Sequence, residues 1–231
     1  MAVVFITGAN RGIGLALTWG FADRGDTVLA AVRAPDKAPD LKRMAAMPDK
    51  HIEILTLDVT DAASIAALKA TLGQRPIDIL VNNAGVIGPE HQTLADMDYD
   101  GWLTTLEVNT LGPFRVLQAL LDNLKAAGNA YVMTITSRMA SFASSRGSDR
   151  LAYRASKAAT NKVMQSVASD LAAMNIAVAV AHPGWVQTGI GGRNADISAE
   201  QSAAGLIHVI DRMSIIHSPR FVNYDGSSIA W

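Results

Sequence analysis

The chain has 231 residues, of which 49% are hydrophobic and 18% are charged, and its formal net charge is -1. This length allows one substantial hydrophobic core, and the near-neutral charge gives no overall field that would attract nucleic acid or an anionic membrane. The absence of cysteine excludes disulfides and thiolate catalysis, and the five histidines have no metal-ligand spacing, so no metal site is expected.

The start of the chain is apolar, but it does not have the pattern of a targeting segment. It begins Met-Ala-Val-Val-Phe-Ile-Thr-Gly, without the basic region or the cleavage site of a signal peptide. No apolar run approaches the roughly 20 residues that a membrane-spanning helix needs. We therefore expect a cytoplasmic protein that acts on a small molecule, with no membrane span and no nucleic acid partner.

Short apolar runs and longer amphipathic stretches alternate along the whole chain. The short runs predict strands at residues 3–7, 27–32, 52–57, 77–81, 131–135, 176–181 and 221–222. The longer stretches predict helices at residues 13–24, 39–46, 62–71, 101–127, 151–174 and 198–212. The short runs lack polar alternation, which is typical of parallel strands that are buried on both faces. The pattern predicts an α/β fold: a single-domain, Rossmann-type, doubly wound parallel sheet of about seven strands with helices on both faces.

The first predicted strand ends in a glycine-rich segment, Thr7-Gly8-Ala9-Asn10-Arg11-Gly12-Ile13-Gly14, and a helix follows at once. Gly8 allows a tight turn, Gly12 lets the backbone approach a pyrophosphate, and Gly14 lets the helix pack close to the strand. The helix N-terminus offers N–H groups and a partial positive charge to phosphates. The alternative is a glycine-rich turn without a ligand, but the position between strand and helix favours a dinucleotide site.

The end of the second predicted strand bears on the choice of nicotinamide cofactor. This strand ends at Arg33, and no carboxylate that could hold a ribose 2′-hydroxyl occurs before Asp36. Arg11 and Arg33 are instead placed to reach a 2′-phosphate, although each could also be a solvated surface residue. The sequence therefore favours NADP(H) over NAD(H).

Tyr153 and Lys157 lie one turn apart in a predicted helix and so share one of its faces. A phenol with a pKa near 10 is a poor acid or base at neutral pH, and a nearby ammonium lowers that pKa. Ser137, directly after a predicted strand, can hydrogen-bond a substrate oxygen beside the tyrosine. The pair alone is weak evidence, but the glycine loop and the serine favour a catalytic interpretation.

Several motifs occur in a characteristic order and spacing over almost the whole chain. They are residues 7–14, Asp58-Val59, Asn82-Asn83-Ala84-Gly85, Asn109, Ile135-Thr136-Ser137, Tyr153 with Lys157, and Pro183-Gly184 with Thr188. In this order they resemble the short-chain dehydrogenase/reductase family of the TGxxxGxG and YxxxK type. Residues 182–188 and 220–226 resemble its C-factor and sniffer-like branch, which is related to carbonyl reductases. Residues 1–231 are then expected to form a single NAD(P)-binding domain.

The resemblance implies a role for each matched residue. Tyr153 would be the general acid in reduction, Lys157 would bind the nicotinamide ribose and tune the tyrosine, and Ser137 would orient the carbonyl. Asn109 would hold the water of a proton relay and complete the catalytic set. The implied cofactor-binding residues are Thr7, Gly8, Asn10, Arg11, Gly12, Ile13, Gly14, Arg33, Asp58, Val59, Asn82, Ala84, Gly85, Tyr153, Lys157, Pro183, Gly184, Val186 and Thr188.

The expected function is NAD(P)-dependent hydride transfer between nicotinamide and a carbonyl or secondary alcohol, with NADPH-dependent carbonyl reduction favoured. The alternative is a nucleotide-binding signalling or sensor protein of the C-factor type with incidental catalysis, but the retained serine, tyrosine and lysine favour the enzyme. A sugar-nucleotide epimerase is discounted, because the chain after Lys157 is too short for the larger substrate region of those relatives. Family members often pair the helices expected at 101–127 and 151–174 across a two-fold axis, so we expect a homo-oligomer, a dimer or a tetramer.

Other residues near the expected site have alternative interpretations. Ser141 is a rival to Ser137, and His182 is expected to be a hydrogen-bonded structural residue. The short segment between Thr188 and the helix expected near Ser198 suggests an open cleft for a small or varied substrate, or for one presented by a larger surface. A group of arginines could attract an anionic substrate or could be solvated and paired, for instance with Asp149; the group consists of Arg138, Arg146, Arg150 and Arg154.

Overall fold

Strands and helices alternate along the chain as the apolar runs predict. The computed structural model describes residues 1–143 and 147–231. The strands are β1 (Val3–Thr7), β2 (Thr27–Val32), β3 (His51–Thr56), β4 (Ile79–Asn82), β5 (Ala130–Ile135), β6 (Ile176–His182) and β7 (Arg220–Asn223). The helices are α1 (Gly12–Asp23), α2 (Pro39–Ala45), α3 (Ala62–Leu72), α4 (Tyr99–Leu106), α5 (Gly112–Ala119), α6 (Leu121–Ala126), α7 (Leu151–Ala172) and α8 (Ala199–Asp211).

The strands form one seven-stranded sheet in the order β3-β2-β1-β4-β5-β6-β7, and every neighbouring pair is parallel. The order reverses between β1 and β4, where Val4 pairs with Val28 on one side and with Ile79 on the other. Parallel neighbours need crossover connections, and the helices supply them. The predicted Rossmann-type doubly wound sheet is confirmed, and its switch point lies between β1 and β4.

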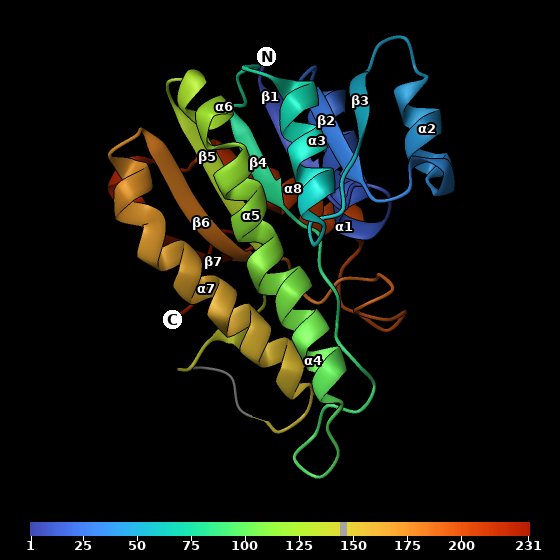
Figure 1. The fold of residues 1–231 in the computed structure, drawn as a ribbon, viewed down its shortest axis with the longest axis vertical. Coiled ribbons are helices and arrows are strands. Elements are labelled where there is room, and N and C mark those ends of the chain that lie inside the picture. Colours follow the sequence, from blue (N-terminus) through green and yellow to red (C-terminus); the bar gives the residue numbers. More distant parts are fainter. Residues whose placement is uncertain (144–146) are drawn as a thin grey trace.

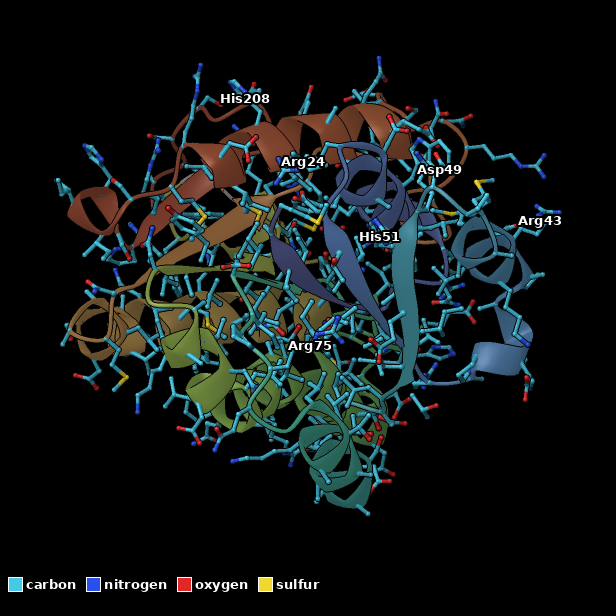
Figure 2. The ribbon with its side chains drawn as sticks, turned by 90° about the horizontal axis from the view of Figure 1, so that it is seen from above. Arg24, Arg43, Asp49, His51, Arg75 and His208 are labelled. Atoms are coloured by element: carbon cyan, nitrogen blue, oxygen red, sulfur yellow. The ribbon has the colours of Figure 1, made fainter. Side chains whose placement is uncertain are left out.

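Both faces of the sheet are covered by helices, because successive strand residues point to opposite sides. Phe5 packs in the cluster that includes residues of α3, α5, α6 and α7, whereas Val4 and Ile6 pack with residues of α1, α2 and α8. Figure 1 shows α4, α5 and α7 on the near face with α1 and α8 behind the sheet. Figure 2 shows the same layers from above, with Arg24 beside α1 and α8. A strand buried on both faces has no polar side, which explains the continuous apolar runs.

The stretch predicted as one helix at residues 101–127 is divided into α4, α5 and α6. A π-helical turn, Glu107–Leu111, separates α4 from α5. Pro113 has no N–H and therefore cannot donate to the carbonyl of Asn109, four residues earlier, as a regular helix requires. The Thr160 hydroxyl of α7 donates to that carbonyl instead, at 2.7 Å. The irregular turn places Asn109 against α7, a common use of π-helical turns at functional sites.

Two kinds of feature are absent from residues 1–143 and 147–231. No helix in these ranges combines the length and the apolar character needed to cross a membrane. In the same ranges, no group of three His, Asp or Glu side chains is arranged so that it could hold a metal ion.

Candidate active site

The loop between β1 and α1 is packed so closely that side chains would not fit at its glycines. A Cβ at Gly14 would lie 2.3 Å from the Gly8 carbonyl oxygen, and a Cβ at Gly12 would lie 3.1 Å from Thr188 Cγ2. Gly8 has a φ of 67° and Gly12 a φ of 53°, which glycine adopts without strain. The N-cap residue of α1, Arg11, makes no side-chain cap to the first N–H groups of the helix. This geometry suits a pyrophosphate cradle.

Asn83, which the sequence analysis did not assign to the site, braces this loop. Its Nδ2 donates to the carbonyl oxygens of Thr7 at 3.0 Å and Gly8 at 3.2 Å, and its backbone N–H donates to Thr7 Oγ1 at 3.0 Å. The adjacent Asn82 faces the interior, where it is buried and donates to the Pro113 carbonyl at 3.3 Å. The two asparagines are adjacent in the sequence motif, and their opposite directions in the structure give them different contacts.

Charged residues follow β2 and β3, at the edge where the far end of a dinucleotide would lie. Arg33 is exposed and interacts electrostatically with Asp58. Burial raises the pKa of Asp58, but hydrogen bonds from Thr60 and the Arg33 charge outweigh it and hold the pKa below its ordinary value. Val59 is buried, and a Cβ on Gly112 would lie 2.8 Å from its Cγ2. The Val59 side chain therefore anchors the end of β3 against α5.

The segment after β6 returns toward the glycine loop. The Pro183 carbonyl accepts a hydrogen bond from Ser202 Oγ at 2.6 Å, and Gly184 has a φ of 88°. Val186 forms a bridge with Ile197, so the segment is pinned at its base. The contact between Thr188 and Gly12 places the tip against the glycine loop. The segment between Val186 and Ile197 is therefore folded back on itself beside the glycine loop.

Ser137, Tyr153 and Lys157 come together at the carboxyl edge of the sheet. Ser137 follows β5, whereas Tyr153 and Lys157 lie in the first two turns of α7. Lys157 is buried; its Nζ donates to the Ile135 carbonyl at 2.8 Å and lies 5.9 Å from the centre of the Tyr153 ring. A Cβ on Gly85 would lie 3.4 Å from this Nζ, so Gly85 lies directly beside the lysine.

The protonation of this group depends mainly on burial. Burial raises the pKa of the Tyr153 phenol, while a hydrogen bond with Ser137 and the positive charge of Arg150 act in the opposite direction. Burial also lowers the pKa of Lys157 to about 8. The expected lowering of the Tyr153 pKa by Lys157 is not found here, because the lysine is directed to the Ile135 carbonyl and the cation acting on the phenol is Arg150.

Asn109 is fully buried and connects the loop after β4 to α7. Its Oδ1 accepts from the Val86 N–H at 2.9 Å, and its Nδ2 donates to the Val86 carbonyl at 2.8 Å and to Ser156 Oγ at 3.0 Å. A Cβ on Gly85 would lie 3.2 Å from Asn109 Oδ1. Asn109 therefore lies on the same side as Lys157 and supports the floor formed by residues 82–86.

The alternative candidates occupy different environments. Ser141 is buried and donates to the Ala230 carbonyl at 2.7 Å, which ties it to the chain end. Burial and the Arg138 charge lower the pKa of His182 to about 4, and its buried Nδ1 has no hydrogen-bond partner in the part of the chain that the structure describes. The expected hydrogen-bonded role of His182 is therefore not found at Nδ1. Arg154 pairs with Asp149 at 2.8 Å, and Arg146 lies outside the described residues.

Comparison with known proteins identifies the family. A family model described as short chain dehydrogenase matches residues 2–197. The chain belongs to the short-chain dehydrogenase family and is an NAD(P)-dependent oxidoreductase.

Two kinds of relative define its branch. The chain is 41% identical to C-signal of Myxococcus xanthus over 156 residues, which are 68% of this chain and 93% of the relative. It is similar to the NADPH-bound carbonyl reductase from chicken fatty liver, with a TM-score of 0.93, 29% identity and coverage of 100% and 99% of the two chains. It is also similar to the carbonyl reductase Sniffer of D. melanogaster, with a TM-score of 0.91 and 28% identity over all of both chains. The chain therefore lies in the C-factor and carbonyl-reductase branch of the family.

Proposed function

We propose that the chain is an NADPH-dependent carbonyl reductase acting on small aldehydes or ketones, with residues 1–231 forming one NAD(P)-binding domain. The observation that carries the proposal is the meeting of Ser137, Tyr153 and Lys157 beside Gly85, at the same sheet edge as the glycine loop. The similarity to carbonyl reductases, one of them with bound NADPH, supports this choice.

The residues around the glycine loop fit a dinucleotide with a 2′-phosphate. Because Gly8, Gly12 and Gly14 have no side chains, the loop packs closely on its neighbours, and the N–H groups at the start of α1 would bind the pyrophosphate. Arg11 and Arg33 would hold the 2′-phosphate. NADPH would supply the hydride. We propose that the other cofactor contacts come from Thr7, Asn10, Ile13, Asp58, Val59, Asn82, Ala84, Gly85, Tyr153, Lys157, Pro183, Gly184, Val186 and Thr188.

The protonation of Tyr153 suits reduction. Because burial raises its pKa, the phenol holds its proton at neutral pH and can donate it to a developing alkoxide. Ser137 would orient the carbonyl oxygen beside the phenol, and Lys157 would hold ribose hydroxyls from the other side. Asn109 would support the proton relay. A nucleotide-binding signalling or sensor protein with only incidental catalysis is not favoured, because it has no need for this assembled group.

The test is a titration with NADPH and with NADH in which binding is measured by nicotinamide fluorescence. A panel of small aldehydes and ketones is then added. We expect tighter binding of NADPH and carbonyl-dependent oxidation of it. Tyr153→Phe should abolish turnover and retain NADPH binding, because it removes only the proton donor. Binding without turnover on the whole panel would favour the sensor alternative. No binding of either nucleotide would overturn the assignment of the glycine loop.

A further inference from the structure

The first turn of α7, which carries Tyr153, is capped by a residue from another loop. Its own N-cap residue, Arg150, has a φ of 53° and makes no side-chain cap. The Gln92 carbonyl instead accepts from the Leu151 N–H at 3.0 Å, and Gln92 Oε1 accepts from the Tyr153 N–H at 3.1 Å. Gln92 thus satisfies two of the N–H groups that a helix start leaves without an intrahelical partner.

The other end of the same side chain holds the loop after β4. Gln92 Nε2 donates to the carbonyl oxygens of Ile87 at 3.1 Å and Pro89 at 2.7 Å. Gln92 is only 5% exposed, so these hydrogen bonds are shielded from water. The side-chain oxygen therefore holds the helix, and the nitrogen holds the loop.

The loop and the helix start that Gln92 joins form one wall of a cavity. This cavity has a volume of about 440 Å³ and is lined by residues 87–90, Gln92, Thr93, Asp149 and Arg150. In Figure 1 the loop after β4 and the start of α7 lie together at the lower end of the view, beside α4. Arg150, whose charge acts on the Tyr153 phenol, lines this cavity, so the cavity lies at the start of α7.

We propose that Gln92 is a positioning residue for the proposed reduction. It fixes the Tyr153 backbone to the loop of residues 87–90, and so holds the first turn of α7, and with it the phenol, in one position. The inference rests on the proposed function and adds a residue outside the matched motifs. Gln92 acts through the main chain of Tyr153, because its oxygen contacts that N–H and not the phenol.

The amide group of Gln92 is suited to this task because it is both an acceptor and a donor. Gln92→Leu has a similar size but loses both functions. Gln92→Glu keeps an acceptor for the Tyr153 N–H but loses the two donated bonds to the loop. Comparison of the two variants therefore separates the effect of the hydrogen bond to α7 from the effect of the hydrogen bonds to the loop.

Asn123 provides a matched control. It is also buried, and its Nδ2 also donates to two loop carbonyls, those of Gly73 at 3.0 Å and Arg75 at 2.8 Å. The two carbonyls belong to the loop before β4, which lies at the end of the strands opposite to the site. Asn123→Leu thus removes a comparable buried amide without touching α7.

The experiment measures turnover of a panel carbonyl, NADPH affinity and amide hydrogen exchange of residues 151–153 in each variant. We expect Gln92→Leu to lower kcat at least about ten-fold while NADPH affinity stays within about two-fold, because misplacing a proton donor affects the chemical step. Its amides at 151–153 should exchange faster. Gln92→Glu should keep slow exchange there and recover part of kcat, and Asn123→Leu should leave both kcat and this exchange unchanged.

The opposite results would overturn the inference. Wild-type kcat and exchange in Gln92→Leu would do so, as would an equal loss of kcat in Asn123→Leu. If Gln92→Leu does not fold, fast exchange at 151–153 in folded Gln92→Glu would overturn it and slow exchange would support it. The exchange readout needs no substrate; if the wild type turns over no carbonyl, the proposed function fails, while the capping of α7 by Gln92 is still decided.

Discussion

Burial sets the protonation of three residues around the site, Tyr153, Lys157 and His182. In each of them the removal of water disfavours the charged form, so the pKa of the phenol rises and the pKa values of the two bases fall, to about 8 and about 4. Neighbouring charges modify this effect and do not reverse it. The local environment thus assigns a proton to Tyr153 and a neutral ring to His182 at neutral pH.

His182 should make the protein sensitive to acid. Its folded-state pKa of about 4 lies below the ordinary 6.5, so the unfolded state takes up a proton first as the pH falls. The free energy of unfolding should therefore fall between pH 6.5 and 4, by about 2 kcal/mol from pH 7 to pH 5 through this residue. Urea unfolding across this pH range should show a smaller fall in the free energy of unfolding for His182→Gln than for the wild type. The same change at exposed His208 should leave the slope as in the wild type, and an equal slope in all three proteins would contradict the assignment.

Arg150 should control the pH dependence of reduction. Its charge lowers the pKa of Tyr153, so Arg150→Gln should raise that pKa and move the alkaline loss of kcat to higher pH. A pH profile of kcat measures this, with Arg43→Gln on α2 as a remote control.

The same variants test whether Arg150 attracts anionic substrates. An unchanged KM for acidic and neutral carbonyls would remove that hypothesis.

Among the elements, the turn from β1 into α1 has little space for change. Gly14→Ala would place a Cβ 2.3 Å from the Gly8 carbonyl and 2.5 Å from Asn83 Nδ2, so the strand end and the helix must separate. We expect a loss of about 1–3 kcal/mol in the free energy of unfolding and weaker NADPH binding. Thermal unfolding and the fluorescence titration measure the two effects. Gly189→Ala is the control, because its Cβ would meet only Arg11 Nη1, at 3.8 Å; equal behaviour of the two variants would refute the packing argument.

The junction between α4 and α5 shows how an element can be divided by one residue. The apolar periodicity continues from 101 to 127 and predicts one helix. However, Pro113 lacks the N–H that would donate to the carbonyl of Asn109 in a regular helix. The carbonyl of Asn109 then bonds to Thr160 on α7. A proline in a helical pattern is visible in the sequence, whereas the partner that takes over its missing bond is visible only in the fold.

For the whole molecule, the exposed apolar side of α4 bears on the expected homo-oligomer. Tyr99 is 70% exposed and Leu103 is 66% exposed, on a helix that lies beside α7 in Figure 1. Leu103→Glu should therefore shift the protein toward monomers in sedimentation velocity. Ile216→Glu is the control, because Ile216 is 88% exposed but follows α8. A wild-type protein that sediments as a monomer would contradict the expectation.

Much of the fold and the outline of the site could be predicted from sequence. Apolar runs without polar alternation predict strands covered on both faces, and strand ends in such a sheet meet at one edge, so Ser137, Tyr153 and the glycine loop could be assigned to one site. The prediction of the fold is confirmed because it depends on local periodicity and on a general rule of sheet topology.

Other properties were decided only by the tertiary structure. The resemblance assigns Asn82 and not Asn83 to the cofactor site, but in the structure Asn82 faces the core and Asn83 braces the glycine loop. Gln92 belongs to no motif, and it caps α7 only because the chain brings a distant loop to that helix. The direction of the Tyr153 pKa follows from burial and from the position of Arg150. Contacts and desolvation depend on the three-dimensional neighbours of a residue, which local sequence patterns do not specify.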